Sequence, residues 1–299
     1  MPSVINTNLA SLFAQNSLSS AQSNLATSVQ RLSSGIRINS SKDDATGLAI
    51  SKSMQGKLNA IGMAEQNAQQ ATNLLQTADS VVGTVQDILL RMKQLAVEGA
   101  NDSISTTQKL NVRTELTTLN TQINNIAKGT TYNGISLLDS TSTSLSFQVG
   151  STTATADQFT VSTIDVTTGT GSGSTSMKAV GGFIADTGTA NSLSLLTATF
   201  GNSAFNTAFA SLTTSLDTAI ETLSSQRATL GSQMNALSYV NTNLLGQQAN
   251  LSASKSTILD TNFADETATL TKGQIMQQAA TAMLAQANQM PNVILSLLK

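Results

Sequence analysis

Leucine and isoleucine recur every seven positions in the second half of the chain. This ladder consists of Leu216, Leu223, Leu230, Leu237, Leu244, Leu251 and Ile258. Because a seven-residue repeat keeps apolar side chains on one stripe of a helix, it predicts a long helix with coiled-coil packing. Such a helix would extend about 64 Å, more than the ~50 Å expected across a compact globule of this chain length. The ladder therefore predicts an elongated molecule and a partner helix.

A second apolar seam lies in the first half of the chain, with steps that alternate between three and four residues. Its members are Ala68, Ala71, Leu75, Ala78, Val82, Val85, Leu89, Met92 and Ala96. Small residues in a seam allow a partner backbone to come close. The seam predicts a helix over about 44–97 that ends near Gly99, with the ladder as its antiparallel partner. Between the leucines of the ladder runs a second, mixed stripe, which we expect to face neighbouring subunits. Its apolar members are Ile220, Met234 and Val240, and its polar members are Gln226, Arg227, Gln233 and Gln247.

Three further helices are predicted from helical spacing of apolar residues. They cover about 3–33, ending at Gly35, about 107–127, and a tail whose seam runs Met276, Ala280, Met283, Ala287, Met290, Ile294, Leu297. Pro291 is expected to kink or restart the tail helix. Ser40 or Ser41 is expected to cap the helix predicted over about 44–97, with Asp43 and Asp44 in its first turn.

The middle of the chain changes from helical to alternating periodicity. Apolar residues alternate with polar ones around Leu145, Phe147 and Val149, and again at Phe159 and Val161, which predicts a β-hairpin. Residues 167–200 are dominated by Thr, Gly and Ser and predict a loop-rich insertion with at most a few strands.

These elements predict a mainly α fold. We expect an elongated antiparallel helical or coiled-coil rod formed by both ends of the chain, with a β-hairpin and a small β- and loop-rich central insert. Three regions are expected. Residues 1–43 and 257–299 form an inner domain of terminal helices, residues 44–166 and 201–256 form the rod with its hairpin, and residues 167–200 form an outward-facing variable insert.

Composition narrows the possible functions. The sequence contains no His and no Cys, which excludes disulfides, zinc sites with these ligands, and nucleophilic catalysis by these side chains. The net charge of −2 gives no reason to expect nucleic acid as a partner, and the five Gln and two Asn of residues 273–298 argue against a membrane span. Acidic pairs such as Asp43 with Asp44 lack a predicted pocket. We therefore predict no catalytic site, no metal and no cofactor.

The amphipathic terminal helices carry few charges and cannot remain solvated without exposing a large apolar face. Burial against copies of the chain is favoured over membrane attachment, because the helices lack a basic polar face. The predicted subunit-packing residues are Ile5, Leu9, Leu12, Leu25, Leu32, Met276, Met283, Met290, Ile294 and Leu297.

Long motifs at both ends carry a resemblance to a known family. The segments INTNLASLFAQNSL and RLSSGIRINSSKDDATGLAIS at the start, and SQRATLGSQMNAL and QIMQQAATAMLAQANQMPNVILSLLK at the end, resemble bacterial flagellin. The resemblance covers about residues 1–140 and 215–299. It implies a subunit of the extracellular flagellar filament, secreted through the flagellar type III apparatus, whose terminal helices fold on assembly. Implied partners are other flagellin subunits, hook-associated and cap proteins and an export chaperone.

The resemblance also implies a receptor surface. Positions Leu89, Arg91, Leu95 and Glu115 match those that similar flagellins present to the innate immune receptor Toll-like receptor five. Thr257 and Asn262 depart from the Arg and Asp that related sequences usually carry, so the junction between inner tube and rod is expected to differ. Two alternatives stay open: a hook–filament junction protein with similar termini, and an enzyme carried in the insert.

Overall fold

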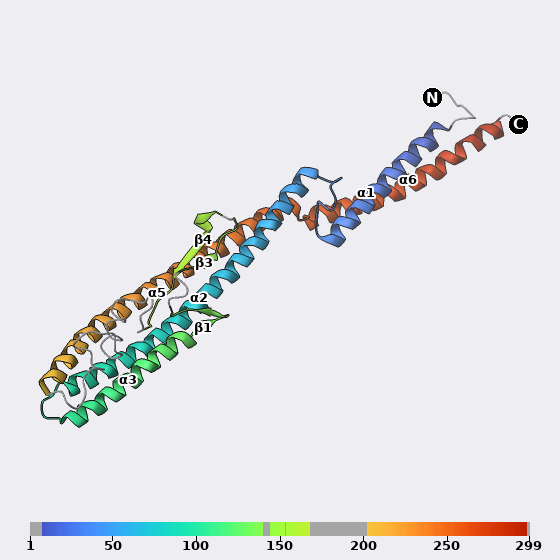
Figure 1. Ribbon diagram of the computed structural model, residues 1–299. Coiled ribbons are helices and arrows are strands. Elements are labelled where there is room, and N and C mark those ends of the chain that lie inside the picture. Colours follow the sequence, from blue (N-terminus) through green and yellow to red (C-terminus); the bar gives the residue numbers. More distant parts are fainter. Residues whose placement is uncertain (1–7, 140–143, 153, 168–201, 298–299) are drawn as a thin grey trace. The chain divides into compact units, whose positions relative to one another are not determined.

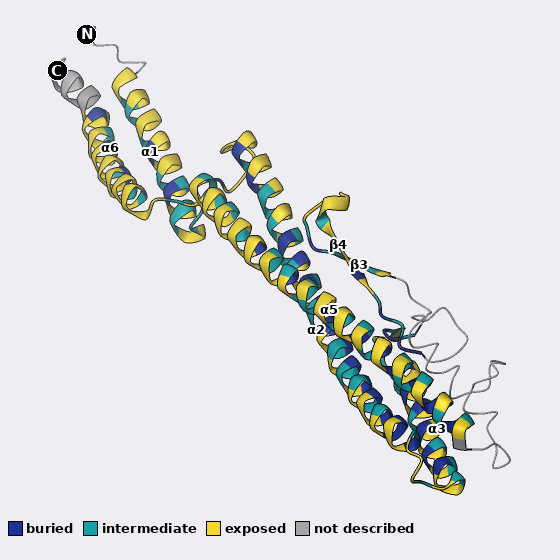
Figure 2. Cartoon of the chain, turned by 90° about the vertical axis from the view of Figure 1, so that its left-hand side faces the viewer, coloured by how far each residue is buried: buried dark blue, intermediate teal, exposed yellow. Residues whose placement is uncertain are grey.

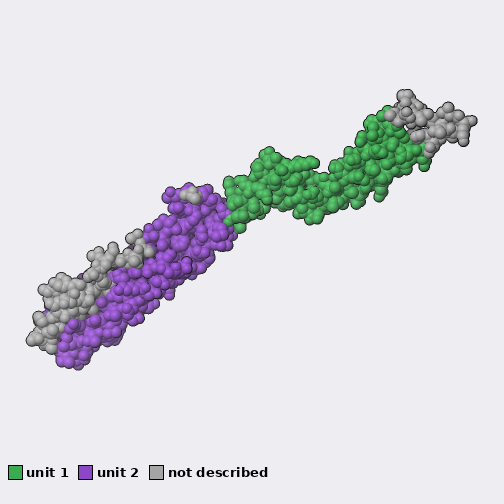
Figure 3. All heavy atoms as spheres, turned by 45° about the vertical axis from the view of Figure 1, so that its right-hand side comes forward, with its two compact units in different colours: residues 1–59, 248–299 green, residues 60–247 purple. Residues whose placement is uncertain are grey.

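The computed structural model describes residues 8–139, 144–152, 154–167 and 202–297, with side chains of the last helix described as far as Gln289. The chain divides into two compact units (Figure 3). Unit 1 contains residues 1–59 and 248–299, and unit 2 contains residues 60–247. These units divide within long helices, whereas the predicted domain limits near residues 43 and 257 follow helix junctions. The three-domain division therefore stays a prediction.

Unit 2 is built on two long helices, α2 (Ala45–Gly99) and α5 (Asn202–Leu259), which lie side by side (Figure 1). Arg227 Nε lies 2.8 Å from Asp79 Oδ1, and Gln86 Nε2 donates to Ser224 Oγ at 2.8 Å. The ion pair between Lys93 and Asp217 continues this series. In these pairs the residue number falls along α5 as it rises along α2. The helices are therefore antiparallel, as predicted.

The α2 seam and most of the ladder lie in the core of unit 2. All nine residues of the α2 seam are buried, from Ala68 to Ala96. The ladder is buried from Leu216 to Leu244, and Leu251 and Ile258, which belong to unit 1, are half-buried. The core therefore confirms the helical register expected from the heptads within unit 2 (Figure 2).

The third helix of unit 2 is α3 (Thr106–Gly129), close to the predicted range 107–127. Its start is a capping box in which Ser105 and Gln108 exchange side-chain and backbone hydrogen bonds. Val112, Leu116 and Ile123 are buried in the same core as the ladder. These three residues, which follow each other at steps of four and seven, therefore lie on the packed face of α3.

Two short hairpins follow α3. Strands β1 (Thr131–Tyr132) and β2 (Ile135–Ser136) are joined by Asn133 and Gly134, whose φ angles of 51° and 78° suit a tight hairpin turn. The predicted hairpin is formed by β3 (Ser144–Gln148) and β4 (Gln158–Ser162), which pair antiparallel with Phe147 opposite Phe159. The single turn η1 (Thr155–Asp157) precedes β4. Apart from Thr167, the predicted insert lies outside the described residues.

Unit 1 contains the helices α1 (Leu9–Ser34) and α6 (Phe263–Leu297). Asn8 caps α1 by accepting from Ser11 N at 3.1 Å, and Gly35, with φ of 73°, ends it as predicted. Helix α6 continues through position 291 to Leu297, so the helix does not restart at Pro291, while the alternative of a kink there stays a prediction. A proline removes one backbone hydrogen bond, but the hydrogen bonds of neighbouring turns remain.

The start of α2 differs from the expectation in its cap. Asp44, rather than Ser40 or Ser41, accepts from the first turn, with Gly47 N donating to Asp44 Oδ1 at 2.8 Å. Asp43 instead accepts from Ser40 N at 2.8 Å, from Ser40 Oγ at 3.0 Å and from Asn39 N at 3.1 Å. These hydrogen bonds, led by the Ser40 backbone N–H, hold the pKa of the Asp43 carboxyl below its ordinary value.

The two turns of unit 1 that connect its helices are bonded to each other. Arg37 N donates to Leu259 O at 2.7 Å, Arg37 Nη2 donates to Ile258 O at 2.8 Å, and Thr261 N donates to Gly35 O at 3.0 Å. On the same stretch, Asn262 Oδ1 accepts from Ala264 N at 3.1 Å and so caps α6. The unusual Asn262 is thus accommodated as a helix cap.

Candidate subunit-packing surface

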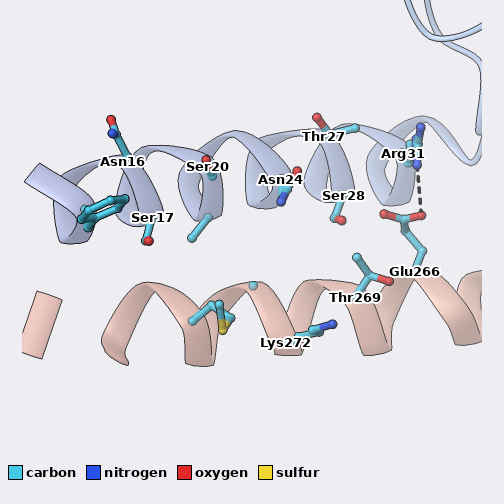
Figure 4. Close-up of a pocket in the computed structure, with 14 residues that line it drawn as sticks. Asn16, Ser17, Ser20, Asn24, Thr27, Ser28, Arg31, Glu266, Thr269 and Lys272 are labelled. Carbon is cyan, nitrogen blue, oxygen red and sulfur yellow. Dashed lines mark ion pairs between the residues drawn. The ribbon is translucent and has the colours of Figure 1, made fainter. Parts of the chain in front are cut away.

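The terminal helices α1 and α6 form an antiparallel pair within unit 1. Near one end, Asn8 Nδ2 donates to Ala287 O at 2.8 Å and Ser11 Oγ donates to Asn288 Oδ1 at 3.0 Å. Near the other, Arg31 Nη1 lies 3.7 Å from Glu266 Oε2, and the two side chains face each other (Figure 4). Residues from opposite ends of the chain are therefore brought together.

The contact between α1 and α6 buries small side chains. Ala21 and Ser28 of α1, and Ala280 and Ala287 of α6, are the buried side chains with a Cβ among the described residues of these two helices. Gly273 is also buried, and a Cβ added there would stand 3.4 Å from the Leu25 side chain. Small residues allow the two backbones to approach closely. They also remove little apolar area from water.

Several large apolar side chains of this pair are exposed instead, while others, such as Leu25 and Leu32, are half-buried. The exposed fractions are 57% for Leu9, 54% for Leu12, 71% for Phe13, 51% for Val29, 60% for Ile275, 50% for Met276 and 64% for Met283. Exposed apolar residues on neighbouring helices are typical of surfaces that other molecules cover. We use the name α1–α6 face for these seven exposed side chains, of which Phe13, Met276 and Met283 line one groove.

Two adjoining grooves run along the α1–α6 pair, and both contain Phe13, Ser17 and Met276. The more apolar groove has a volume of about 470 Å³ and is lined mainly by alanine, Phe13, Met276 and Met283. The other has a volume of about 580 Å³ and is lined mostly by polar residues of α1, with Glu266, Thr269 and Lys272 of α6 (Figure 4). Arg31 Nε and Glu266 Oε1 are buried there without a hydrogen-bond partner among the described residues.

The predicted subunit-packing residues separate into three groups. Leu9, Leu12, Met276 and Met283 are exposed on the α1–α6 face, and Leu25 and Leu32 are half-buried. Ile5 lies outside the described residues, as do the side chains of Met290, Ile294 and Leu297. The predicted set omitted Phe13, Val29 and Ile275. For Phe13, the position beside Leu12 in an apolar stripe was a signal that could have identified it.

The predicted receptor residues lie in two different environments in unit 2. Arg91 of α2 and Glu115 of α3 are exposed and form an ion pair, with Arg91 Nη2 2.9 Å from Glu115 Oε1. Leu89 and Leu95 are 0% and 2% exposed. Because a partner cannot reach buried side chains, Leu89 and Leu95 can contribute to such a surface only by supporting it from the core.

The described residues include no group of three or more His, Cys, Asp or Glu placed to hold a metal ion. Among the described helices, none has the length and apolar character needed to cross a bilayer. The described helices of unit 1 instead present exposed apolar side chains.

These features define a class of mainly helical proteins whose N- and C-terminal helices pair and expose an apolar face. The family model described as "Bacterial flagellin N-terminal helical region" matches residues 5–143. The model described as "Bacterial flagellin C-terminal helical region" matches residues 213–298. The chain belongs to the bacterial flagellin family.

Individual relatives agree with this assignment. The chain is 36% identical to flagellin of Bacillus subtilis over 99% of both chains. It is 33% identical to the flagellar filament 33 kDa core protein of Treponema phagedenis, over 99% of this chain and all of that protein. Among solved structures, the crystal structure of Bacillus cereus flagellin covers 64% of this chain and 94% of that chain, at 31% identity and a TM-score of 0.44.

Proposed function

We propose that this chain is a structural subunit that self-assembles into the extracellular flagellar filament used for swimming, without enzymatic activity. The observation that carries the proposal is the α1–α6 face, where large apolar side chains are exposed while mainly small ones are buried. A second copy of the chain would remove this surface from water. Relatives named as flagellin and as a filament core protein support the same role.

The filament role brings further partners with it. Hook-associated and cap proteins would contact the subunit at the ends of the filament, and an export chaperone would bind it before secretion. The exposed Arg91–Glu115 pair on α2 and α3 supports a second, weaker proposal, that this region is a ligand surface for Toll-like receptor five. Its two charges are accessible on the described surface.

Assembly of the full chain on preformed seeds tests the main proposal. Deletion of residues 274–299 removes most of α6 and is expected to leave a soluble chain that no longer elongates seeds. Light scattering and electron microscopy measure the elongation. A truncated chain that still forms filaments would contradict the role given to α6 in assembly, and a full chain that fails to elongate seeds would contradict the main proposal.

Point variants make the same test without deleting a helix. Phe13→Asp and Met283→Asp place a charge at exposed positions, so the isolated chain should keep its unfolding transition while elongation is lost. The matched controls, Phe13→Leu and Met283→Leu, keep the surface apolar and should elongate seeds. Equal elongation by the Asp and Leu variants would show that the α1–α6 face does not carry assembly.

A further inference from the structure

Two methionines stand on one stripe of α6 and line the apolar groove of the α1–α6 face. Met276 and Met283 are one heptad apart and are 50% and 64% exposed. Phe13 lines the same groove from α1. Their thioether sulfurs are therefore accessible to small solutes in the isolated chain.

Other methionines of the chain stand in contrasting environments. Met92 is fully buried in the core of unit 2, and Met234 is half-buried against that core. Met63 of α2 is 56% exposed, but it belongs to unit 2 and not to the α1–α6 face. The chain thus contains a protected methionine and an exposed one away from the surface in question, and both serve as internal references.

We propose that Met276 and Met283 are modification sites at which a two-electron oxidant, such as hydrogen peroxide, reversibly blocks self-assembly. The thioether sulfur attacks one peroxide oxygen, the O–O bond breaks as an S–O bond forms, and the departing hydroxide takes the remaining proton to leave water. Sulfur is oxidised to the sulfoxide and peroxide is reduced. The inference rests on the proposed function, because it concerns the same face.

The physical basis is the change in side-chain polarity at a surface that a second copy of the chain would cover. A sulfoxide turns a flexible apolar side chain into a polar, chiral one. Ser17 and Gln286 are the polar residues that line this groove, and alanine supplies half of its lining. A sulfoxide oxygen covered by a second copy would therefore lose water without gaining adequate hydrogen bonds. Oxidation would act on chains before assembly, since packing covers both sulfurs.

The test compares the full chain before and after a limited dose of hydrogen peroxide. Peptide mass mapping should find sulfoxide at Met276, Met283 and Met63 well before Met92. The critical concentration for seeded elongation should rise about tenfold or more, the effect of leaving one polar group buried without a partner. Treatment with both stereospecific sulfoxide reductases should restore elongation.

Matched variants assign the effect to the two residues. After the same dose, Met276→Leu/Met283→Leu should elongate seeds as well as before, although Met63 is oxidised. After peroxide treatment, Met63→Leu should lose elongation as the treated wild-type chain does. The modification proposal is overturned if the peroxide-treated double variant loses elongation as the treated wild-type chain does. It is also overturned if oxidation at both positions leaves elongation of the wild-type chain unchanged.

The untreated samples separate this inference from the proposed function. If neither the untreated chain nor the untreated double variant elongates seeds, self-assembly itself fails as the function, and the inference falls with it. If both assemble before treatment and the oxidised chain assembles equally well, only the modification proposal fails. A slower oxidation of Met276 and Met283 in filaments than in free chains would support both.

Discussion

At the scale of single residues, small side chains decide where helices of this protein meet. Ala68, Ala71 and Ala78 are buried in the α2 seam, and Ala280 and Ala287 have the same role in α6. Where the backbone comes closer still, only glycine fits. A Cβ added at Gly99, the last residue of α2, would stand 2.5 Å from the buried ring of Phe209. Such contacts make even one methyl group costly.

Substitution of glycine should therefore have opposite effects at two helical positions. Gly99→Ala is expected to destabilise unit 2 by about 1–3 kcal/mol, because the Phe209 ring cannot move without disturbing the core. Gly231→Ala, with nothing within 4 Å of the added Cβ, should stabilise α5 by roughly 0.5–1 kcal/mol. Urea unfolding followed by circular dichroism measures both. Equal effects at the two sites would contradict the close packing at Gly99.

At the scale of elements, α5 has a firmly packed stripe beside a mixed one. The leucine ladder is buried, while Gln226, Arg227 and Gln233 of the neighbouring stripe are half-buried. Arg227 bonds to Asp79 and Gln86 of α2, and the expectation that the stripe faces neighbouring subunits stays a prediction. Hydrogen bonding to Asp79 raises the pKa of the Arg227 guanidinium. Through Arg227, the mixed stripe thus helps to join α5 to α2.

The ladder makes a prediction that depends on the register of the helix. Leu237→Ala removes a side chain that is 1% exposed and should destabilise unit 2 by about 2–5 kcal/mol. Leu245→Ala, on the same helix at 47% exposure, should change stability by less than about 1 kcal/mol. Denaturant midpoints at a constant slope measure the difference. Similar losses for both variants would mean that the ladder does not form the packed face.

At the scale of the whole molecule, the two units differ in what they bury. Unit 2 has a continuous core that includes Phe205, Phe209 and the ladder leucines. Among the described residues of unit 1, the buried apolar side chains are Ala21, Ile38, Ala280 and Ala287. Since stability follows the apolar area removed from water, unit 1 has much less to hold it together in a single chain. Assembly would supply the missing burial.

Hydrogen exchange should report this difference directly. In the unassembled chain, amides of α1 and α6 are expected to exchange at least about a hundredfold faster than amides of α5 between Leu216 and Leu237, because local opening is easier where little apolar area is buried. In filaments, α1 and α6 should become protected. Mass spectrometry of peptic fragments measures both states. Equal protection of α1 and α5 in the free chain would contradict a unit 1 that depends on assembly.

Much of the fold could be predicted because long helices carry periodic signals. The seam from Ala68 to Ala96 and the ladder as far as Leu244 indicated their buried faces correctly, since helical spacing alone decides which side chains share a stripe. The hairpin around Phe147 and Phe159 followed from alternation in the same way. The cap at Asp44 was missed, because several neighbouring polar residues could cap that helix and only local geometry selects one.

The candidate surface was predictable in location but not in detail. Apolar periodicity placed Leu9 and Leu12 on one stripe of α1 and Met276 and Met283 on one stripe of α6, but it could not distinguish stripes buried within a chain from stripes left exposed. The receptor prediction shows the same limit, because Leu89 and Leu95 have the spacing of core residues and lie in the core. A pattern defines a face of a helix, whereas exposure depends on what that face meets.

By itself, the sequence determined the helices, their apolar stripes, the hairpin and the absence of His and Cys chemistry, because these depend on residue type and spacing. Tertiary structure alone decided that α1 and α6 meet through alanine, serine and glycine, with Phe13, Met276 and Met283 left exposed. The physical reason is that, in a packed pair, each helix turns only one stripe of its surface toward the other. When small residues take that contact, the large apolar side chains are left for another molecule to cover.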